Sequence, residues 1–231
     1  MYLGIDNCTN SASVCLYDNG LLYEETWEAQ MQHTTTTLPK IEQALLNLGR
    51  NFKHLKGIAC AKGPGSFNGT RAGMSLGLGL GMSLGIPVVF VSSLEISALP
   101  FADCGQPIVS LMNAGRNEVY TAVFQKKQEE PWQNIVSEHI STLEEILDKI
   151  KEPTLFCGEY VNEIGYTIKE HLADLAIIPS VQENKRSALF LIKAALSKLE
   201  TGCDEVPEPL YLRKPPITIS NKTVVSLNKL K

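Results

Sequence analysis

The order of strand-like and helix-like segments repeats once along the chain, and this repeat restricts the fold more than any other feature. Apolar runs and turn residues over 3–99 indicate three strands, then a helix, a strand, a helix, a strand and a helix. The same order returns over 108–199, after a linker at 101–107 that contains Asp, Gly and Pro. The sequence therefore predicts an α/β fold of two tandem βββαβαβα units, 1–102 and 103–231.

Apolar spacing and turn residues place the individual elements. The predicted strands of the first unit are 3–6, 12–17, 21–28, 55–60 and 88–91, and its helices are 34–48, 70–85 and 94–99. The predicted strands of the second unit are 108–112, 119–124, 135–140, 154–157 and 176–178, and its helices are 143–150, 161–172 and 188–199. This order is the topology of the actin, sugar-kinase and Hsp70-like superfold, an analogy that predicts the fold and not the function.

Composition excludes several classes of protein. Hydrophobic residues make up 44% of the 231 residues and charged residues 20%, so the chain can bury a core and is not disordered. The net charge of −4 excludes a polycation that coats nucleic acid. After Glu208 the chain carries five basic residues and no acidic one. We interpret this segment as a solvated tail, with a weak RNA or phosphate contact as the alternative.

The cysteines and the N-terminus indicate a cytoplasmic protein. The six cysteines form no Cys-x-x-Cys pair, and the N-terminus lacks the basic and apolar regions of a signal peptide, so we expect reduced, mostly buried thiols. Residues 72–94 carry no charge and are long enough to span a bilayer. Because Pro87 interrupts this Gly- and Ser-rich stretch, a buried helix followed by a buried strand is the favoured interpretation, and we expect no membrane contact.

A glycine-rich loop at 61–73 follows a predicted strand and opens a predicted helix, where free N–H groups can bind an anion. It is not a Walker A loop, because no Lys follows Gly69. It is not a Rossmann fingerprint either, because its Gly-x-Gly-x-x-x-Gly spacing is one residue too long. A tight turn that needs glycine explains the loop at least as well as phosphate binding.

A weak nucleotide site is the functional alternative for this loop, with Asp6, Gly63, Gly65 and Ser66 as its residues. In the actin-like superfold the loop after the first strand grips phosphate, and its Asp helps to hold a metal ion. That loop normally reads Asp-x-Gly, whereas Cys8 stands at the glycine position and hampers close approach of a phosphate. No two of the four histidines are spaced as a helical metal-binding pair. We therefore expect no catalytic residue, no metal and no cofactor.

Glycines recur every four residues in the next predicted helix, at Gly69, Gly73, Gly77, Gly81 and Gly85. Each interior glycine costs about 1 kcal/mol relative to alanine, so the groove that they form must regain this energy through close packing. Two interpretations remain open, namely packing against the chain's own sheet or first helix, and docking of a helix from another subunit. Met74, Leu78 and Met82 form a neighbouring apolar stripe that suits a partner.

Residues 63–73, Gly-Pro-Gly-Ser-Phe-Asn-Gly-Thr-Arg-Ala-Gly, resemble the GPGSFTGxRxG signature of the bacterial TsaB (YeaZ) family. Further landmarks of that family follow in the same order, at 5–9, 33–34, 91–94, 113–120 and 209–213. The resemblance thus covers nearly the whole chain. The chain departs from the family pattern at Asn68, Asn113, Gly115 and Asn117, where Thr, Asp, Arg and Gly are usual.

The resemblance implies a role in making threonylcarbamoyladenosine at position 37, beside the anticodon of tRNAs that read ANN codons. In that pathway another enzyme makes threonylcarbamoyl-AMP, and the metal-containing paralogue TsaD transfers the threonylcarbamoyl group to tRNA. TsaB-like proteins lack the metal ligands and act as the non-catalytic partner of TsaD, and the small ATPase TsaE joins them. The resemblance further implies a homodimer in isolation and a tRNA contact that is indirect or weak.

The resemblance also implies that the partner docks on the N-terminal unit. The predicted partner-binding residues are His33, Leu38, Arg71, Gly73, Met74, Gly77, Leu78, Gly81 and Met82. The alternative function is a small ATPase or phosphotransferase of the actin-like superfold. It needs a working phosphate loop at Asp6 and a Gly-Gly pair in the second unit, where Gly158 is the nearest candidate. A metallopeptidase is disfavoured by the missing His pair.

Overall fold

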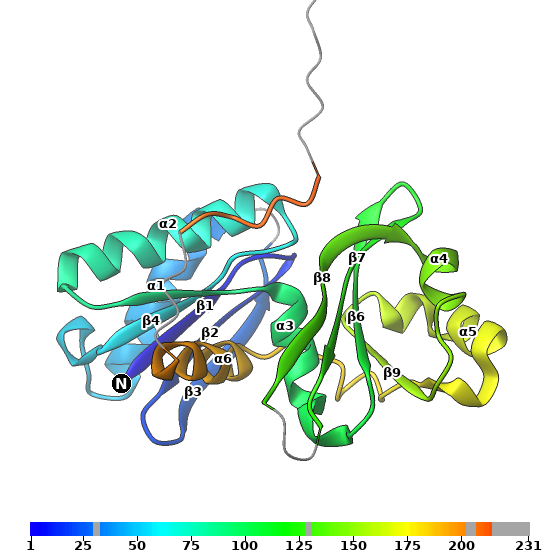
Figure 1. Ribbon diagram of the computed structural model, residues 1–231. Coiled ribbons are helices and arrows are strands. Elements are labelled where there is room, and N and C mark those ends of the chain that lie inside the picture. The colour runs from blue at the N-terminus through cyan, green and yellow to red at the C-terminus, as the bar shows by residue number, and fades with distance from the viewer. Residues whose placement is uncertain (30–32, 128–130, 202–206, 214–231) are drawn as a thin grey trace, which may run out of the picture.

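The computed structural model describes the chain except for residues 30–32, 128–130, 202–206 and 214–231, and it leaves out the side chains of residues 33 and 34. The protein folds into two α/β lobes that lie next to each other (Figure 1). Each lobe is built on a mixed sheet of five strands.

The first lobe has the predicted order of elements. Its strands are β1 (Tyr2–Asp6), β2 (Ser11–Tyr17), β3 (Leu21–Glu28), β4 (Gly57–Ala61) and β5 (Val88–Val91). Its helices are α1 (His33–Asn47), α2 (Phe67–Leu84) and α3 (Ser93–Ala98), with 3-10 turns at Phe52–His54 and Leu99–Cys104. The strands lie in the order β3-β2-β1-β4-β5, with β1 antiparallel to β2 and parallel to β4.

The second lobe repeats this arrangement, which confirms the predicted fold class. Its strands are β6 (Ile108–Gly115), β7 (Glu118–Gln125), β8 (Gln133–Thr142), β9 (Thr154–Cys157) and β10 (Ala176–Ile177). Its sequence also contains α4 (Leu143–Leu147), α5 (Val161–Leu172), a 3-10 turn at Ala173–Leu175, and α6 (Ala188–Glu200). The strands lie in the order β10-β9-β6-β7-β8.

Helices cover both faces of the first sheet. On one face α1 and α2 pack side by side, and Ile41 and Leu45 of α1 are buried in the core beneath them. On the other face lies α6, whose Leu191 and Ile192 are buried against the strands (Figure 1). The predicted division after residue 102 assigns α6 to the second unit. In the structure α6 packs on the sheet of the first lobe instead.

The uncharged segment 72–94 forms a helix followed by a strand, as the sequence predicts. The helix is α2, which packs on the sheet, and the strand is β5. Within the described ranges, no helix combines the length and apolarity needed to cross a membrane. Four cysteines are buried and free, Cys104 is exposed and free, and Cys203 lies outside the described residues. Burial raises the pKa of the Cys8 thiol to about 12, so this side chain stays protonated.

Candidate functional site

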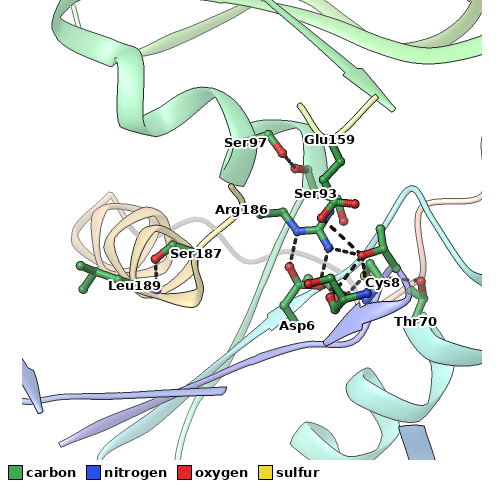
Figure 2. Close-up of polar contacts among 12 residues, drawn as sticks. Asp6, Cys8, Thr70, Ser93, Ser97, Glu159, Arg186, Ser187 and Leu189 are labelled. Carbon is green, nitrogen blue, oxygen red and sulfur yellow. Dashed lines mark hydrogen bonds and ion pairs between the residues drawn. The ribbon is translucent and has the colours of Figure 1, made fainter. Parts of the chain in front are cut away.

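The loop after β1 carries a buried ion pair between the two halves of the sequence. Asp6 closes β1 and is 1% exposed. Arg186, from the segment before α6, donates from Nε to Asp6 Oδ2 at 2.6 Å and from Nη2 to Oδ1 at 3.5 Å. Figure 2 shows the guanidinium lying directly over the carboxylate. The backbone N–H of Cys8 also donates to Oδ1 at 3.0 Å, so both carboxylate oxygens have partners.

Arg186 also reaches the second lobe. Its Nη1 lies 3.7 Å from Oε1 of Glu159, which follows β9 (Figure 2). Its Nη2 donates to Thr9 Oγ1 at 3.0 Å. Burial by itself lowers the pKa of the guanidinium, but the carboxylates of Asp6 and Glu159 more than offset this and raise it. The side chain is only 4% exposed and stays charged, so it joins the lobes as a fixed internal cation.

The glycine-rich loop packs against the loop after β1. The N–H of Ser66 donates to the carbonyl of Cys8 at 2.6 Å, and a Cβ atom at Gly65 would lie 2.0 Å from that oxygen. Ser66 also caps α2, because its Oγ accepts from the N–H of Gly69 at 3.2 Å. The carbonyl of Gly63 accepts from the N–H of Ser93 at 2.7 Å. The glycines therefore permit a close contact between two loops.

The four predicted nucleotide-site residues lie in the loops after β1 and β4, and groups of Asp6, Gly63 and Ser66 bond within the chain. Asp6 is paired with Arg186, and the loop N–H of Ser66 bonds to the neighbouring loop. Gly158 is similarly engaged, because its N–H and carbonyl both bond to the side chain of Asn184, at 2.8 and 3.1 Å. A Cβ atom there would meet the carbonyl of Leu111 at 2.2 Å.

An open cleft of about 310 Å³ lies between the lobes next to these loops. Its lining comprises Cys8, Thr9, Asn10, Gly65, Ser66, Met112, Asn113, Glu159, Tyr160 and Glu163. Among the described residues that line it there are two carboxylates and no basic side chain. This charge pattern opposes the binding of a polyphosphate, which needs cations or free N–H groups.

The glycine groove of α2 faces the chain's own sheet, which corrects the placement of four predicted docking residues. Gly73, Gly77 and Gly81 are buried, and so is Met74, which is 3% exposed. A Cβ atom at Gly77 would lie 2.1 Å from Cys60 Sγ, and one at Gly81 would lie 2.3 Å from a methyl group of Val88. The groove is thus filled by side chains of the chain's own sheet, which is the first of the two alternatives that the sequence left open.

The other predicted docking residues take different positions. Met82 is 84% exposed and Arg71 is exposed, whereas Leu38 and Leu78 are half-buried. His33 opens α1, but its side chain lies outside the described part of the chain. The apolar stripe therefore passes from the core to the surface along α2.

The segment after α6 crosses the start of α2 and reaches the second lobe. Tyr211 stacks on Phe67 with ring centroids 5.2 Å apart, and Arg71 Nε donates to its hydroxyl at 2.6 Å. Arg213 then donates to the carbonyl of Ala114 at 3.2 Å and pairs with Glu118. Three landmark segments of the sequence, at 63–73, 113–120 and 209–213, are thereby joined. The basic residues beyond Arg213 lie outside the described residues.

The part of the chain that the structure describes contains no set of metal ligands. No group of three or more His, Cys, Asp or Glu residues there is placed to hold a metal ion. His139 lies on β8 and His171 on α5, far apart in the sequence and in different elements.

Comparison with known proteins identifies the family. Residues 27–220 match the family model described as TsaD, tRNA N6-adenosine threonylcarbamoyltransferase. The chain is 30% identical over 191 residues to the tRNA threonylcarbamoyladenosine biosynthesis protein TsaB of Bacillus subtilis, covering 80% of this chain and 82% of that protein. It is 29% identical over 224 residues to TsaB of Haemophilus influenzae, covering 91% and 92%.

The chain belongs to the TsaB family. Its function is therefore in tRNA threonylcarbamoyladenosine biosynthesis. A crystal structure from Pseudomonas aeruginosa, described as similar to peptidase YeaZ, superposes with a TM-score of 0.74 at 23% identity and covers 92% of this chain and 99% of that one. The ethanolamine utilization protein EutJ of Carboxydothermus hydrogenoformans superposes with a TM-score of 0.51 at 10% identity, covering 82% of this chain and 88% of that one, which shows a shared fold.

Two members of the site in this TsaB-family chain were not predicted as site residues from the sequence. Arg186 lies in the polar run 182–187, which has the composition of an exposed loop. Asn184 lies in the same run, and its side chain is buried against Gly158. No sequence signal marks this run, because only the structure shows that the following helix packs on the first sheet.

Proposed function

We propose that this chain is a non-catalytic subunit that supports the transfer of the threonylcarbamoyl group to N6 of adenosine 37 by a TsaD-like paralogue. The observation that carries the proposal is the ion pair between Asp6 and Arg186. An internal guanidinium satisfies the carboxylate that an actin-like nucleotide enzyme needs for its metal ion. The protein acts in the cytoplasm, on the pathway that its family defines.

The lining of the interlobe cleft supports the non-catalytic role. Its carboxylates, Glu159 and Glu163, disfavour nucleotide phosphates, and the N–H of Ser66 is already bonded. Gly158, the nearest candidate for adenosine contact, is held by Asn184. The alternative of a small ATPase therefore lacks a free Asp6 carboxylate and a free Gly158.

Docking to the paralogue uses the outer face of α1 and α2 instead of the glycine groove. On α2 this face carries Ser75, Gly79 and Met82, all exposed, and no atom of a neighbouring segment lies within 4 Å of a Cβ placed at Gly79. On the adjacent α1, Leu46 is 70% exposed. Small residues next to exposed apolar side chains allow a partner helix to approach closely and bury them. The same face forms the homodimer of the isolated chain, and a TsaE-like ATPase joins the heterodimer.

Met82→Asp is expected to weaken binding to the TsaD-like paralogue at least about tenfold, because an unpaired carboxylate would become buried in the interface. Since Met82 is 84% exposed, the fold of the free chain is expected to be unchanged. Titration calorimetry with the two purified proteins measures the affinity. Tyr166→Asp is the matched control, because Tyr166 on α5 is 80% exposed and lies outside this face.

Equal loss of affinity in Met82→Asp and Tyr166→Asp would show a non-specific effect of charge. Unchanged affinity in a folded Met82→Asp protein would show that this end of α2 does not contact the paralogue. Binding that is retained in Met82→Leu but lost in Met82→Asp would support an apolar contact at this position.

A further inference from the structure

A second cavity, of about 250 Å³, lies in the second lobe, away from the interlobe cleft. It opens between one face of strands β6, β7 and β8 and the segment that contains α4 and residues 149–152. Its residues are Pro107, Val109, Thr121, Val123, Ile135, Val136, His139, Ile146, Lys149, Ile150, Lys151, Glu152 and Thr154. Seven of these thirteen residues are aliphatic and six are polar or charged, so the cavity combines apolar walls with polar groups, as small-molecule sites do.

The floor of the cavity holds a hydroxyl group without a partner. Thr121 is 1% exposed, and its Oγ1 makes no hydrogen bond to any described residue. Thr121 lies on the same face of β7 as Val119 and Val123, which pack in the core of this lobe. A buried hydroxyl that lacks a partner has lost its hydrogen bonds to water without replacement, which is unfavourable. A ligand atom in the cavity can remove this cost by bonding to it.

The edge strand β8 is irregular where it borders the cavity. Thr121 pairs with His139, but Val123 pairs with Val136, so one extra residue of β8 is accommodated between the two pairs. Bulges of this kind re-aim side chains and are frequent beside binding sites. Here the shift keeps both His139 and Val136 at the cavity. His139 bonds through Nδ1 to the carbonyl of Ser137 at 2.8 Å.

The rim of the cavity has an excess of positive charge. Lys149, Lys151 and Glu152 line it, and all three are exposed. Lys151 Nζ bonds to the carbonyl of Asp148 at 2.8 Å. Lys149 projects from the turn after α4. The cavity thus presents a cation at its mouth, apolar walls along its length and a hydroxyl at its floor.

We propose that this cavity binds a short aliphatic carboxylate that carries a hydroxyl or carbonyl group at its far end. The carboxylate pairs with Lys149 at the rim, the chain packs against Val123, Val136 and Ile146, and the far polar atom bonds to Thr121 Oγ1. The site is separate from the docking face and from the ion pair of Arg186, so it does not depend on the proposed function.

The test uses three six-carbon probes and the full chain. We expect 6-hydroxyhexanoate to bind more tightly than hexanoate, and hexanoate more tightly than hexylamine, in titrations followed by amide chemical shifts. The shifts are expected at β7, β8 and α4. Lys149→Gln should weaken both carboxylates about tenfold, as expected for a lost charged hydrogen bond. Lys185→Gln, an exposed lysine outside the cavity, should leave them unchanged.

Thr121→Val separates the role of the floor from that of the rim. Valine has nearly the shape of threonine and removes an unpaired buried hydroxyl, so the fold is expected to be retained. The preference for 6-hydroxyhexanoate over hexanoate should disappear in this variant, while the affinity for hexanoate stays. The proposal is overturned if no probe gives saturable shifts at the cavity, if hexylamine binds as well as hexanoate, or if Lys149→Gln changes neither carboxylate.

Discussion

Replacing Arg186 with methionine is expected to lower the free energy of unfolding by about 3–5 kcal/mol, because it leaves a buried carboxylate without its counter-ion. Asp6 is 1% exposed and depends on Arg186 for two of its hydrogen bonds. Methionine keeps an unbranched apolar stem of nearly the same bulk, so the loss reflects mainly the missing guanidinium charge and its hydrogen bonds. The change also removes the link to Glu159 in the second lobe.

Urea unfolding followed by circular dichroism measures this effect. Lys126→Met is the matched control, because Lys126 pairs with Asp103 on the surface, with side chains 43% and 86% exposed, and should change stability by less than about 1 kcal/mol. Asp6→Asn combined with Arg186→Met should recover most of the loss, since no unpaired charge then remains buried. Similar stability in the Arg186 and Lys126 variants would contradict the role of Arg186 as an internal counter-ion.

Gly77→Leu is expected to lower the free energy of unfolding by about 3 kcal/mol, at the upper end of the cost of overpacking a core. The first side-chain atom would already lie 2.1 Å from Cys60 Sγ and 3.6 Å from Ile58. Cys60 is fully buried in β4, within the core of the first lobe. The helix α2 must therefore move away from the sheet to accept the new side chain.

Gly79→Leu on the same helix is the matched comparison. Nothing lies within 4 Å of a Cβ atom at Gly79, and the residue is exposed, so replacement of glycine in the helix interior should stabilise the free chain by up to about 1 kcal/mol. Because Gly79 lies on the proposed docking face, the same variant should weaken paralogue binding. Equal destabilisation by both changes would contradict the orientation of α2.

The order of elements could be predicted because each element carries its own local signal. The stripe of Ile41 and Leu45 has helical spacing, and the runs at 88–91 and 154–157 are apolar and bounded by turn residues. The orientation of α2 could not be predicted in this way. Glycine at every fourth position creates a groove, but only the neighbouring β4 decides whether the groove is filled by the chain itself.

The candidate site was predicted only in part, because its contacts join distant parts of the sequence. Asp6 ends one predicted strand and the glycine-rich loop follows another, and the sequence assigned both to one weak nucleotide site. Arg186 comes from 180 residues further along, in a polar run with no distinctive spacing. Local patterns carry no information on which surface-like arginine becomes buried when α6 returns to the first sheet.

The central claim is that the chain supports the TsaD-like paralogue without being a catalyst itself. Its most direct test measures the threonylcarbamoyladenosine that the paralogue forms in tRNA. The reaction mixture contains threonylcarbamoyl-AMP and the TsaE-like ATPase. We predict modification with the wild-type chain, little without it, and a loss with Met82→Asp that a higher concentration of the variant restores. ATP turnover by the chain alone should be absent. Full modification without the chain, or ATP turnover by the isolated chain, would contradict its role as a non-catalytic docking subunit.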